Sequence, residues 1–291
     1  MACNAVGVRW RCFISAVVVA AFLRVQAAPE PVVEIPFQFR EGLIQVRVKV
    51  PQSAEPLNFL LDTGASVSVI DLHTAQRLGL KPGKKVHVLG VHSATDGYWP
   101  TRLTARSGDF PLPEDYLAVD MQQFSDACEF SVEGLLGVDF FRDRVVQIDF
   151  AAETIRLFNR ENTTSKGEVL PLEIRRCGMR VQLCVNGGKP QWTRLDTGCA
   201  SALQWVTSTV RTEKCERRIA IGLNKLSIPQ ATTTVRIGSI VFEAVPTGLH
   251  RKPIFAGESG LLGNGLLARF SSITIDARAG RAVLGVRLPA S

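Results

Sequence analysis

The chain carries an internal duplication, which limits the folds that it can adopt. Four segments of the first half recur in the same order in the second half: 36–50 as 171–185, 62–64 (Asp-Thr-Gly) as 196–198, 134–137 (Gly-Leu-Leu-Gly) as 260–263, and 148–157 as 275–284. Two repeats are too few for a solenoid, in which each repeat must stack on its neighbours. We therefore expect two similar lobes that face each other.

The residue pattern within each half is typical of β-strands. Residues 45–50 alternate between polar and apolar side chains, and residues 145–150 form a run rich in β-branched residues. Glycine and proline signals separate such runs along the chain. The sequence predicts an all-β fold with lobes at 28–158 and 169–291, joined by a polar linker at 159–168.

One short helix is predicted in the first lobe. Asp71 can cap its N-terminus, residues 73–78 can fill it, and Gly79 can end it. The run that follows the second Asp-Thr-Gly, 202–210, lacks this signal. We therefore expect the second lobe to have diverged further from the shared pattern.

Residues 1–27 are typical of an export signal. Arg9 and Arg11 give a positively charged start, the apolar run 13–23 is too short to span a membrane, and small residues at 25–27 suit a cleavage site. We expect the mature chain to be exported, secreted or periplasmic, without stable membrane insertion. The alternative is an uncleaved segment that anchors the chain to a membrane.

Composition and motifs narrow the function classes. The net charge of +7 includes arginines of the leader, and no basic block alternates with aromatic residues, so nucleic acid is not an expected partner. No Cys/His spacing predicts a metal site, and neither Gly-x-Ser-x-Gly nor His-Glu-x-x-His occurs. We expect no metal or cofactor. The odd number of cysteines after the leader leaves their pairing open: Cys128, Cys177, Cys184, Cys199 and Cys215.

The two Asp-Thr-Gly turns are the candidate site. Each follows a strand-like run, and a glycine two residues after an acid permits a tight turn and close backbone approach. Two such turns related by the duplication can bring Asp62 and Asp196 side by side. Adjacent carboxyls cannot both ionise, so they share one proton and act as an acid and a base. A single Asp-Thr-Gly would be read as a surface turn, but its repetition at equivalent points favours paired chemistry.

At these residues the sequence resembles the aspartic peptidases of the pepsin and retropepsin type, over roughly 35–284. The resemblance implies that each lobe is a retropepsin-like closed β-barrel and that a catalytic cleft lies between the lobes. It implies catalytic roles for Asp62 and Asp196. It further implies that Thr63 and Thr197 hydrogen-bond across to the opposing loop. The glycines of the two supporting loops are Gly64 and Gly198.

The resemblance also implies partners and a chemistry. The apolar runs 135–137 and 261–263 would cross beneath the catalytic loops. Substrates would be peptides or unfolded proteins, and a monomer is expected because both acids belong to one chain. The function predicted is that of an aspartic endopeptidase that hydrolyses peptide bonds with a water activated between two carboxylates. The alternatives are a catalytically weak or inactive peptide-binding module on the same fold, and a structural or inhibitor-like domain.

Two residues beside the motifs depart from the family pattern. Pepsin-like members hold Ser or Thr after each motif glycine, whereas this chain has Ala65, which is normal for retropepsins, and Cys199. Cys199 is expected to be a small buried filler. Arg194 stands where the first lobe has Leu60, on the same side of its strand as Asp196. We expect its side chain to turn to solvent. With Arg194 distant from the two carboxyls, we predict that activity is greatest at weakly acidic pH, near about pH 4–6.

The family resemblance further implies a hairpin flap from the first lobe, and the segment 85–103 lies at the appropriate place. Asp96-Gly97 is a hairpin-turn signal, with Tyr98 and Trp99 beside it as candidate substrate-binding residues. The alternative is an ordinary surface hairpin whose aromatic side chains stack.

Overall fold

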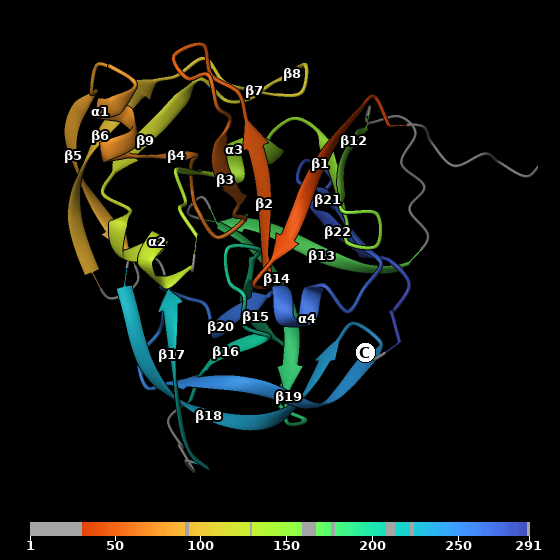
Figure 1. The fold of residues 1–291 in the computed structure, drawn as a ribbon. Helices are drawn as coiled ribbons and strands as arrows, with labels where there is room; N and C mark the ends of the chain where they lie inside the picture. The colour runs from red at the N-terminus through yellow and green to blue at the C-terminus, as the bar shows by residue number, and fades with distance from the viewer. Residues whose placement is uncertain are drawn as a thin grey trace, which may run out of the picture.

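The fold is built almost entirely from strands, as the sequence predicts. The computed structural model describes residues 31–90, 93–128, 130–158, 167–175, 178–207, 213–221 and 224–289. The predicted leader at 1–27 lies outside these residues, as does most of the predicted linker; Glu168, its last residue, is the first residue of a strand. We call residues 31–158 the first half and residues 167–289 the second half (Figure 1).

Both halves are built from strands that range from two residues in β7 and β8 to 14 residues in β18. The first half contains β1 (Val33–Arg40), β2 (Leu43–Val48), β3 (Leu57–Leu61), β4 (Val69–Asp71), β5 (Lys84–Gly90), β6 (Ser93–Arg102), β7 (Arg106–Ser107), β8 (Phe110–Pro111), β9 (Asp115–Val119), β10 (Gly134–Leu136), β11 (Val145–Asp149) and β12 (Thr154–Phe158). The second half contains β13 (Glu168–Arg175), β14 (Gly178–Val185), β15 (Gln191–Asp196), β16 (Leu203–Val206), β17 (Glu213–Ile221), β18 (Asn224–Ile237), β19 (Ile240–His250), β20 (Gly260–Gly263), β21 (Ser272–Asp276) and β22 (Arg281–Leu284).

The strand pairings repeat between the halves, so the duplication read from the sequence extends to topology. In the first half the order is β2-β3-β10-β4-β9-β6-β5, with β3–β10 and β4–β9 parallel and the other pairs antiparallel. In the second half the order is β14-β15-β20-β16-β19-β18-β17, with β15–β20 and β16–β19 parallel. Each strand in one of these orders therefore has a counterpart in the other.

The two halves differ in how far this order closes on itself. In the second half β14 also pairs with β18, which completes a ring of paired strands. In the first half the described pairings do not join β2 to β6; instead Lys49, just beyond β2, bridges to Arg106 of β7. The β7–β8 hairpin therefore lies beside β2, whereas β18 pairs with the corresponding strand of the second half, β14.

A sheet of six antiparallel strands joins the halves, in the order β1-β12-β11-β21-β22-β13. Its central pair, β11 and β21, occupies equivalent positions in the two halves, and each strand ends inside a repeated segment, 148–157 or 275–284. Ile148 lies opposite Ile273 in this pair, and both side chains are buried. Gln147 Nε2 donates to Thr274 Oγ1 across the same boundary at 3.0 Å. Equivalent strands of the two halves therefore pack against each other where the halves meet.

The helices are short: α1 (Leu72–Arg77), α2 (Gln122–Ala127), α3 (Val138–Phe141) and α4 (Asn264–Leu267). The prediction for α1 is confirmed. Asp71 caps it by accepting a hydrogen bond from the Thr74 N–H at 2.8 Å, and Gly79 follows it with φ +67°. The α3 and α4 helices follow the two Gly-Leu-Leu-Gly segments, and the sequence pattern did not predict them or α2.

The predicted hairpin in the first half forms, but its turn is elsewhere. β5 and β6 pair from Lys84 opposite Trp99 to Gly90 opposite Ser93, so the connection is 91–92. Asp96 and Gly97 lie inside β6, opposite His87 and Val86, and the predicted turn there is wrong. Cross-strand pairing over the whole length of β5 outweighs a local Asp-Gly signal.

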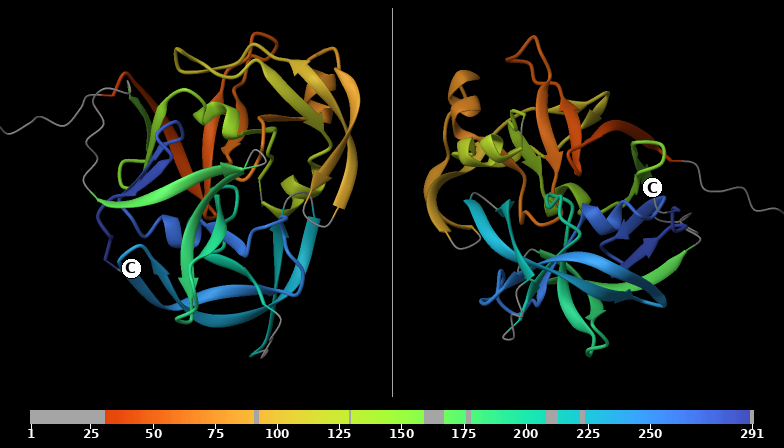
Figure 2. Two further views of the ribbon diagram at one scale, coloured as in Figure 1. Left: turned by 180° about the vertical axis from the view of Figure 1, so that it is seen from behind. Right: turned by 60° about the horizontal axis from the view of Figure 1, so that its bottom comes forward.

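The second half contains a counterpart of this hairpin, β17–β18. Figures 1 and 2 show the β5–β6 and β17–β18 hairpins approaching each other end to end beside α2, and α2 contacts both β17 and β18. The sequence pattern predicts that the second half diverges further after its Asp-Thr-Gly, because the helix signal is absent there. Its strands in that region nevertheless pair in the equivalent order.

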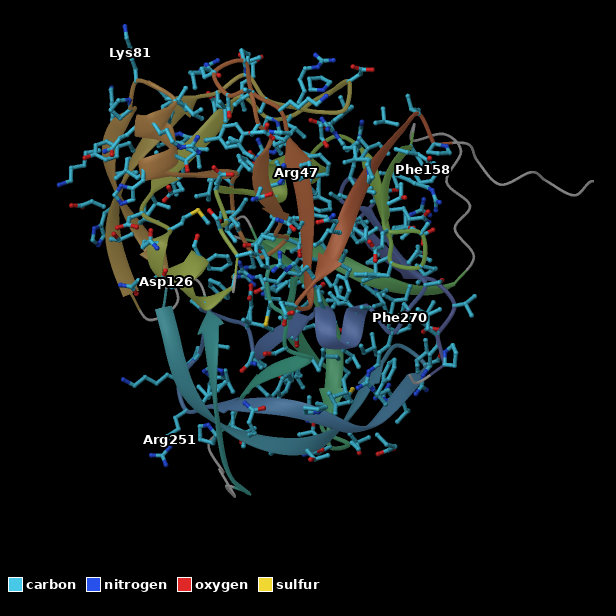
Figure 3. The ribbon with its side chains drawn as sticks, in the orientation of Figure 1. Arg47, Lys81, Asp126, Phe158, Arg251 and Phe270 are labelled. Atoms are coloured by element: carbon cyan, nitrogen blue, oxygen red, sulfur yellow. The ribbon has the colours of Figure 1, made fainter. Side chains whose placement is uncertain are left out.

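Apolar side chains fill the interior of both halves. Phe59 and Phe270, from the first and second half, are fully buried, whereas Lys81 and Arg251 point outward (Figure 3). Burial of this kind is the main stabilising contribution to folding. Within the described ranges, no helix combines the length and apolar character needed to cross a membrane.

Candidate active site

The two Asp-Thr-Gly loops follow equivalent buried strands, β3 and β15. Each of these strands runs parallel to a strand from a Gly-Leu-Leu-Gly segment, with Leu61 opposite Leu136 and Leu195 opposite Leu262. The Asp62 N–H donates to Leu136 O at 2.9 Å and begins the first loop. The duplicated apolar segments therefore support the loops directly, as the family resemblance implies.

Each motif glycine lies against the aspartate of the opposite half. A Cβ placed on Gly64 would lie 2.7 Å from Asp196 Cγ, and a Cβ on Gly198 would lie 2.5 Å from Asp62 Cγ. Both separations are shorter than a carbon–carbon contact allows. Glycine at these positions therefore permits the two carboxyls to meet.

The carboxyl groups of Asp62 and Asp196 form a hydrogen-bonded pair, which we call the dyad. Asp62 Oδ1 accepts from the N–H groups of Gly64 at 2.8 Å and Ala65 at 3.1 Å, and Asp196 Oδ1 accepts from Gly198 N–H at 3.0 Å. A hydrogen bond between two carboxyls requires a proton on one of them. Two carboxyls in contact can share one proton, which makes one of them an acid and the other a base.

The surroundings of the dyad shift the two carboxyls unequally. Burial raises the pKa of Asp62, while the Gly64 and Ala65 N–H groups oppose that rise. The pKa of Asp196 lies well above its ordinary value, because burial and the adjacent Asp62 both disfavour its ionised form. The pair therefore keeps a proton to higher pH than an isolated aspartate does.

Thr63 and Thr197 link the loops reciprocally. Thr63 Oγ1 donates to Leu195 O at 2.7 Å and accepts from the Thr197 N–H at 3.0 Å. Thr197 Oγ1 donates to Leu61 O at 2.8 Å and accepts from the Thr63 N–H at 3.0 Å. Both side chains are buried. The four hydrogen bonds fix the position of each loop relative to the other half, as the resemblance implies.

Asn264 provides a further link that sequence reasoning missed. Its Nδ2 donates to Thr197 O at 2.7 Å and to Gly42 O at 2.8 Å, so it joins the second Asp-Thr-Gly loop to the β1–β2 turn of the first half. Gly42 adopts φ +76° and packs against Ala200. The available signal was the position of Asn264 directly after the second Gly-Leu-Leu-Gly.

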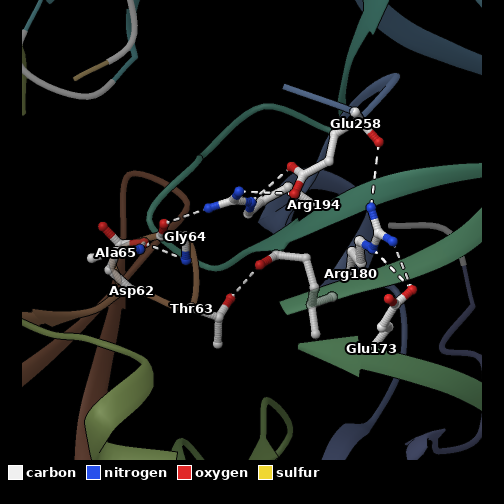
Figure 4. A network of polar contacts seen from close by, with 10 residues as sticks. Asp62, Thr63, Gly64, Ala65, Glu173, Arg180, Arg194 and Glu258 are labelled. Carbon is white, nitrogen blue, oxygen red and sulfur yellow. Dashed lines mark hydrogen bonds and ion pairs between the residues drawn. The ribbon is translucent and has the colours of Figure 1, made fainter. Parts of the chain in front are cut away.

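Arg194 does not turn to solvent, and that expectation is wrong. Its side chain is 6% exposed and forms a bidentate ion pair with Glu258, with Nε and Nη2 each 2.8 Å from a carboxylate oxygen. Its Nη1 donates to Gly64 O in the first half at 3.1 Å (Figure 4). The alternation of side chains along the strand indicated on which side of β15 Arg194 lies. It could not reveal Glu258, a partner 64 residues further along the chain.

The residues that follow the motif glycines play different parts. Ala65 has no side-chain hydroxyl, and its backbone N–H binds Asp62 instead. Cys199 is buried beside Asp196, as expected of a small filler. Burial, and then the negative charge of Asp196, raises the pKa of Cys199 to about 12, which keeps the thiol neutral.

The remaining candidates lie away from the dyad contacts. Tyr98 is partly buried and packs against the main apolar cluster, and Trp99 is half-buried opposite Lys84. Their predicted role in substrate binding stays a prediction. Cys184 is a buried free thiol whose Sγ accepts from Arg236. In the part of the chain that the structure describes, no three His, Cys, Asp or Glu side chains are grouped to bind a metal ion.

Comparisons with known proteins agree with this geometry. The aspartyl protease family model matches residues 46–140. The retrovirus-related Pol polyprotein from transposon 412 of Drosophila melanogaster is 26% identical over 117 residues, which span 40% of this chain and only 9% of that protein. The crystal structure of the aspartic proteinase from Irpex lacteus has the same fold, with a TM-score of 0.56 at 12% identity over 88% of this chain and 97% of that one. The sequence match to aspartyl proteases therefore covers residues 46–140, and the likeness in fold to an aspartic proteinase covers most of the chain.

Proposed function

We propose that the protein is an aspartic endopeptidase that hydrolyses peptide bonds with the Asp62–Asp196 dyad. The observation that carries the proposal is the close approach of two buried carboxyls, each of which lies against the motif glycine of the opposite half. Groups of this kind, paired and separated in proton affinity, are suited to act as a base and an acid in one step. The cross-linked threonines support the same proposal, because they hold the pair fixed.

The proposed mechanism uses one water molecule and one shared proton. The ionised carboxylate accepts a proton from the water, whose oxygen attacks the carbonyl carbon of the scissile peptide bond. The protonated carboxyl donates its proton to the carbonyl oxygen, which gives a neutral gem-diol. The carboxyl that accepted the proton of the water then donates it to the amide nitrogen as the carbon–nitrogen bond breaks. A hydroxyl of the gem-diol gives its proton to the other carboxylate, so the dyad returns to its singly protonated state.

We propose an extended peptide or an unfolded protein as substrate, enclosed by the β5–β6 and β17–β18 hairpins. The convergence of these hairpins beside α2 supports this (Figures 1 and 2). We further propose two lobes with the substrate between them, a monomeric enzyme, since both aspartates belong to one chain, and export directed by residues 1–27.

The test is hydrolysis of an unfolded protein at several acidic pH values by the mature chain and by Asp62→Asn and Asp196→Asn. Each variant should lose activity while keeping the native circular dichroism spectrum, because asparagine is nearly isosteric but cannot share a proton. Asp109→Asn, the same substitution at an exposed aspartate between β7 and β8, serves as the matched control and should stay active. Activity of more than a few per cent in either asparagine variant would contradict the two-acid mechanism.

The alternative, a peptide-binding module without turnover, predicts a different result. The mature chain would bind a peptide that mimics the tetrahedral intermediate yet cleave no substrate at any pH. Arg194 and Cys199 motivated this alternative. Neither replaces an acid, and the dyad is complete. We therefore favour turnover.

A further inference from the structure

The ion pair of Arg194 breaks the symmetry of the dyad surroundings. Arg194 lies opposite Leu261 on β20, and Leu60 lies opposite Leu135 on β10, so the two residues occupy equivalent positions. Leu60 is buried among apolar residues and has no polar atom in its side chain. Each of these residues stands two positions before its aspartate, so the two halves place a leucine and an arginine at equivalent positions.

The guanidinium of Arg194 is held in one place. It pairs with Glu258 through two hydrogen bonds of 2.8 Å, and its Cζ lies 3.8 Å from the centre of the Phe255 ring. On its other side, a Cβ on Gly178 would lie 2.3 Å from Cζ, so only glycine leaves room there. Few other orientations remain for the side chain.

The third contact of Arg194 reaches the dyad through one peptide group. Nη1 donates to Gly64 O, and the N–H of the same peptide, that of Ala65, donates to Asp62 Oδ1 (Figure 4). Hydrogen bonds in series polarise one another, so a cation at the carbonyl end strengthens donation at the N–H end. Leu60 cannot make the equivalent contact to the loop that serves Asp196.

We propose that Arg194 is a positioning residue that directs the shared proton to Asp196 and leaves Asp62 ionised as the base that activates water. The proposal rests on the aspartic peptidase function proposed above and assigns the roles within that mechanism. Arg194 acts on Asp62 specifically through the Gly64–Ala65 peptide, whereas its charge favours the ionised form of both carboxyls. Glu258 holds the guanidinium in place and partly offsets its charge.

The charged and titratable side chains near the dyad determine the expected pH effect. Among the described residues these are Arg194 on β15, Glu258 behind it, and the thiol of Cys199 in the second loop. Arg194 favours the ionised form of both carboxyls. The thiol stays neutral throughout the acidic range because its pKa is raised to about 12. The charges of Arg194 and Glu258 are therefore the ones that substitution can change in order to shift the pKa values of the dyad.

Two variants shift this field in opposite directions. Arg194→Leu/Glu258→Leu replaces the pair with apolar side chains, a change that buried ion pairs often tolerate, and it should move the bell-shaped pH–rate profile to higher pH. Glu258→Gln keeps the cation and removes its counter-charge, so the bell should move to lower pH. In the double variant kcat should also fall about tenfold or more, with KM little changed, because the loop loses its orientation.

A neighbouring ion pair provides the matched control. Arg180 is also buried, pairs with Glu173, lies over Trp192, and donates to Gly257 O, but it makes no contact with either catalytic loop (Figure 4). Arg180→Leu/Glu173→Leu should leave the bell where it is in the unmodified enzyme. Shifts of the same sign in the two test variants, no shift in either, or an equal shift in the control would overturn the proposal.

Carboxyl ¹³C NMR at about pH 5 tests the proton assignment without turnover. Asp62→Asn and Asp196→Asn assign the resonances. The protonated carboxyl should be that of Asp196 in the unmodified protein, and the two carboxyls should become more alike in Arg194→Leu/Glu258→Leu. Protonation of Asp62 instead would overturn the assignment. An unmodified enzyme without activity at any pH would contradict the proposed function rather than this inference.

Discussion

Replacing the Thr63 hydroxyl tests the rigid connection between the two loops. Thr63→Val keeps the shape of the side chain but removes the acceptor of the Thr197 N–H and the donor to Leu195 O, at 3.0 and 2.7 Å. These backbone groups are held in a buried site, and each polar group left without a partner costs about 1–3 kcal/mol. Thr63→Val should therefore lower the free energy of unfolding by about 2–4 kcal/mol.

Urea denaturation of three proteins measures this effect. Thr63→Ser is the matched control, because it keeps both hydrogen bonds and loses a methyl group, which costs about 1 kcal/mol. With a slope of about 3 kcal/mol per molar urea, the midpoint should fall by about 1 M for Thr63→Val and about 0.3 M for Thr63→Ser. Equal midpoints for the two variants would refute the reasoning. Thr197→Val should behave like Thr63→Val, because its hydroxyl makes the reciprocal bonds.

The remaining predictions concern the glycines, the acids and the thiol. Gly64→Ala and Gly198→Ala should each abolish activity while a native circular dichroism spectrum remains, since each Cβ would press on the opposite carboxyl; retained activity would contradict the close approach. The pKa of Asp196 is raised in the folded state, so its protonated carboxyl stabilises the fold below the unfolded value of 3.8, and this contribution is lost as pH rises through the folded value. Asp196→Asn should therefore be more stable than the unmodified protein at neutral pH and equally stable in strong acid. A stability difference that is independent of pH would contradict this. Cys199, buried and neutral, should react with a thiol reagent only after unfolding, which mass spectrometry of the native and urea-denatured protein can show.

Much of the fold was predictable because the duplication repeats whole strands. The Asp71 cap and Gly79 define α1 by local rules, and structure and sequence agree there. The Asp96-Gly97 turn was wrong because a dipeptide preference is weak against the pairing of two long strands. The equivalence of β17–β18 with β5–β6 was invisible in the sequence, since strand pairing tolerates extensive change of side chains.

Sequence analysis likewise predicted one part of the candidate site and was wrong about another. Asp62 and Asp196 were found because their motif repeats, and backbone geometry then requires them to meet. Arg194 was assigned to the wrong environment because its burial depends on Phe255 and Glu258, which lie in a loop before β20. The stabilising partner of a buried charge is a tertiary property, and one strand pattern carries no information about it. The burial of Arg194 also removes the basis for the expected optimum near about pH 4–6, because its cation favours ionisation of the dyad.

The rate of hydrolysis of one unfolded substrate, measured from about pH 2 to 8, tests the central claim most directly. A dyad that works with one shared proton is active only between its two macroscopic ionisations. We expect a bell-shaped profile with its maximum on the acid side of neutrality, because burial raises the pKa of both carboxyls while Arg194 limits the rise. A rate that increases monotonically toward alkaline pH would contradict the shared-proton mechanism.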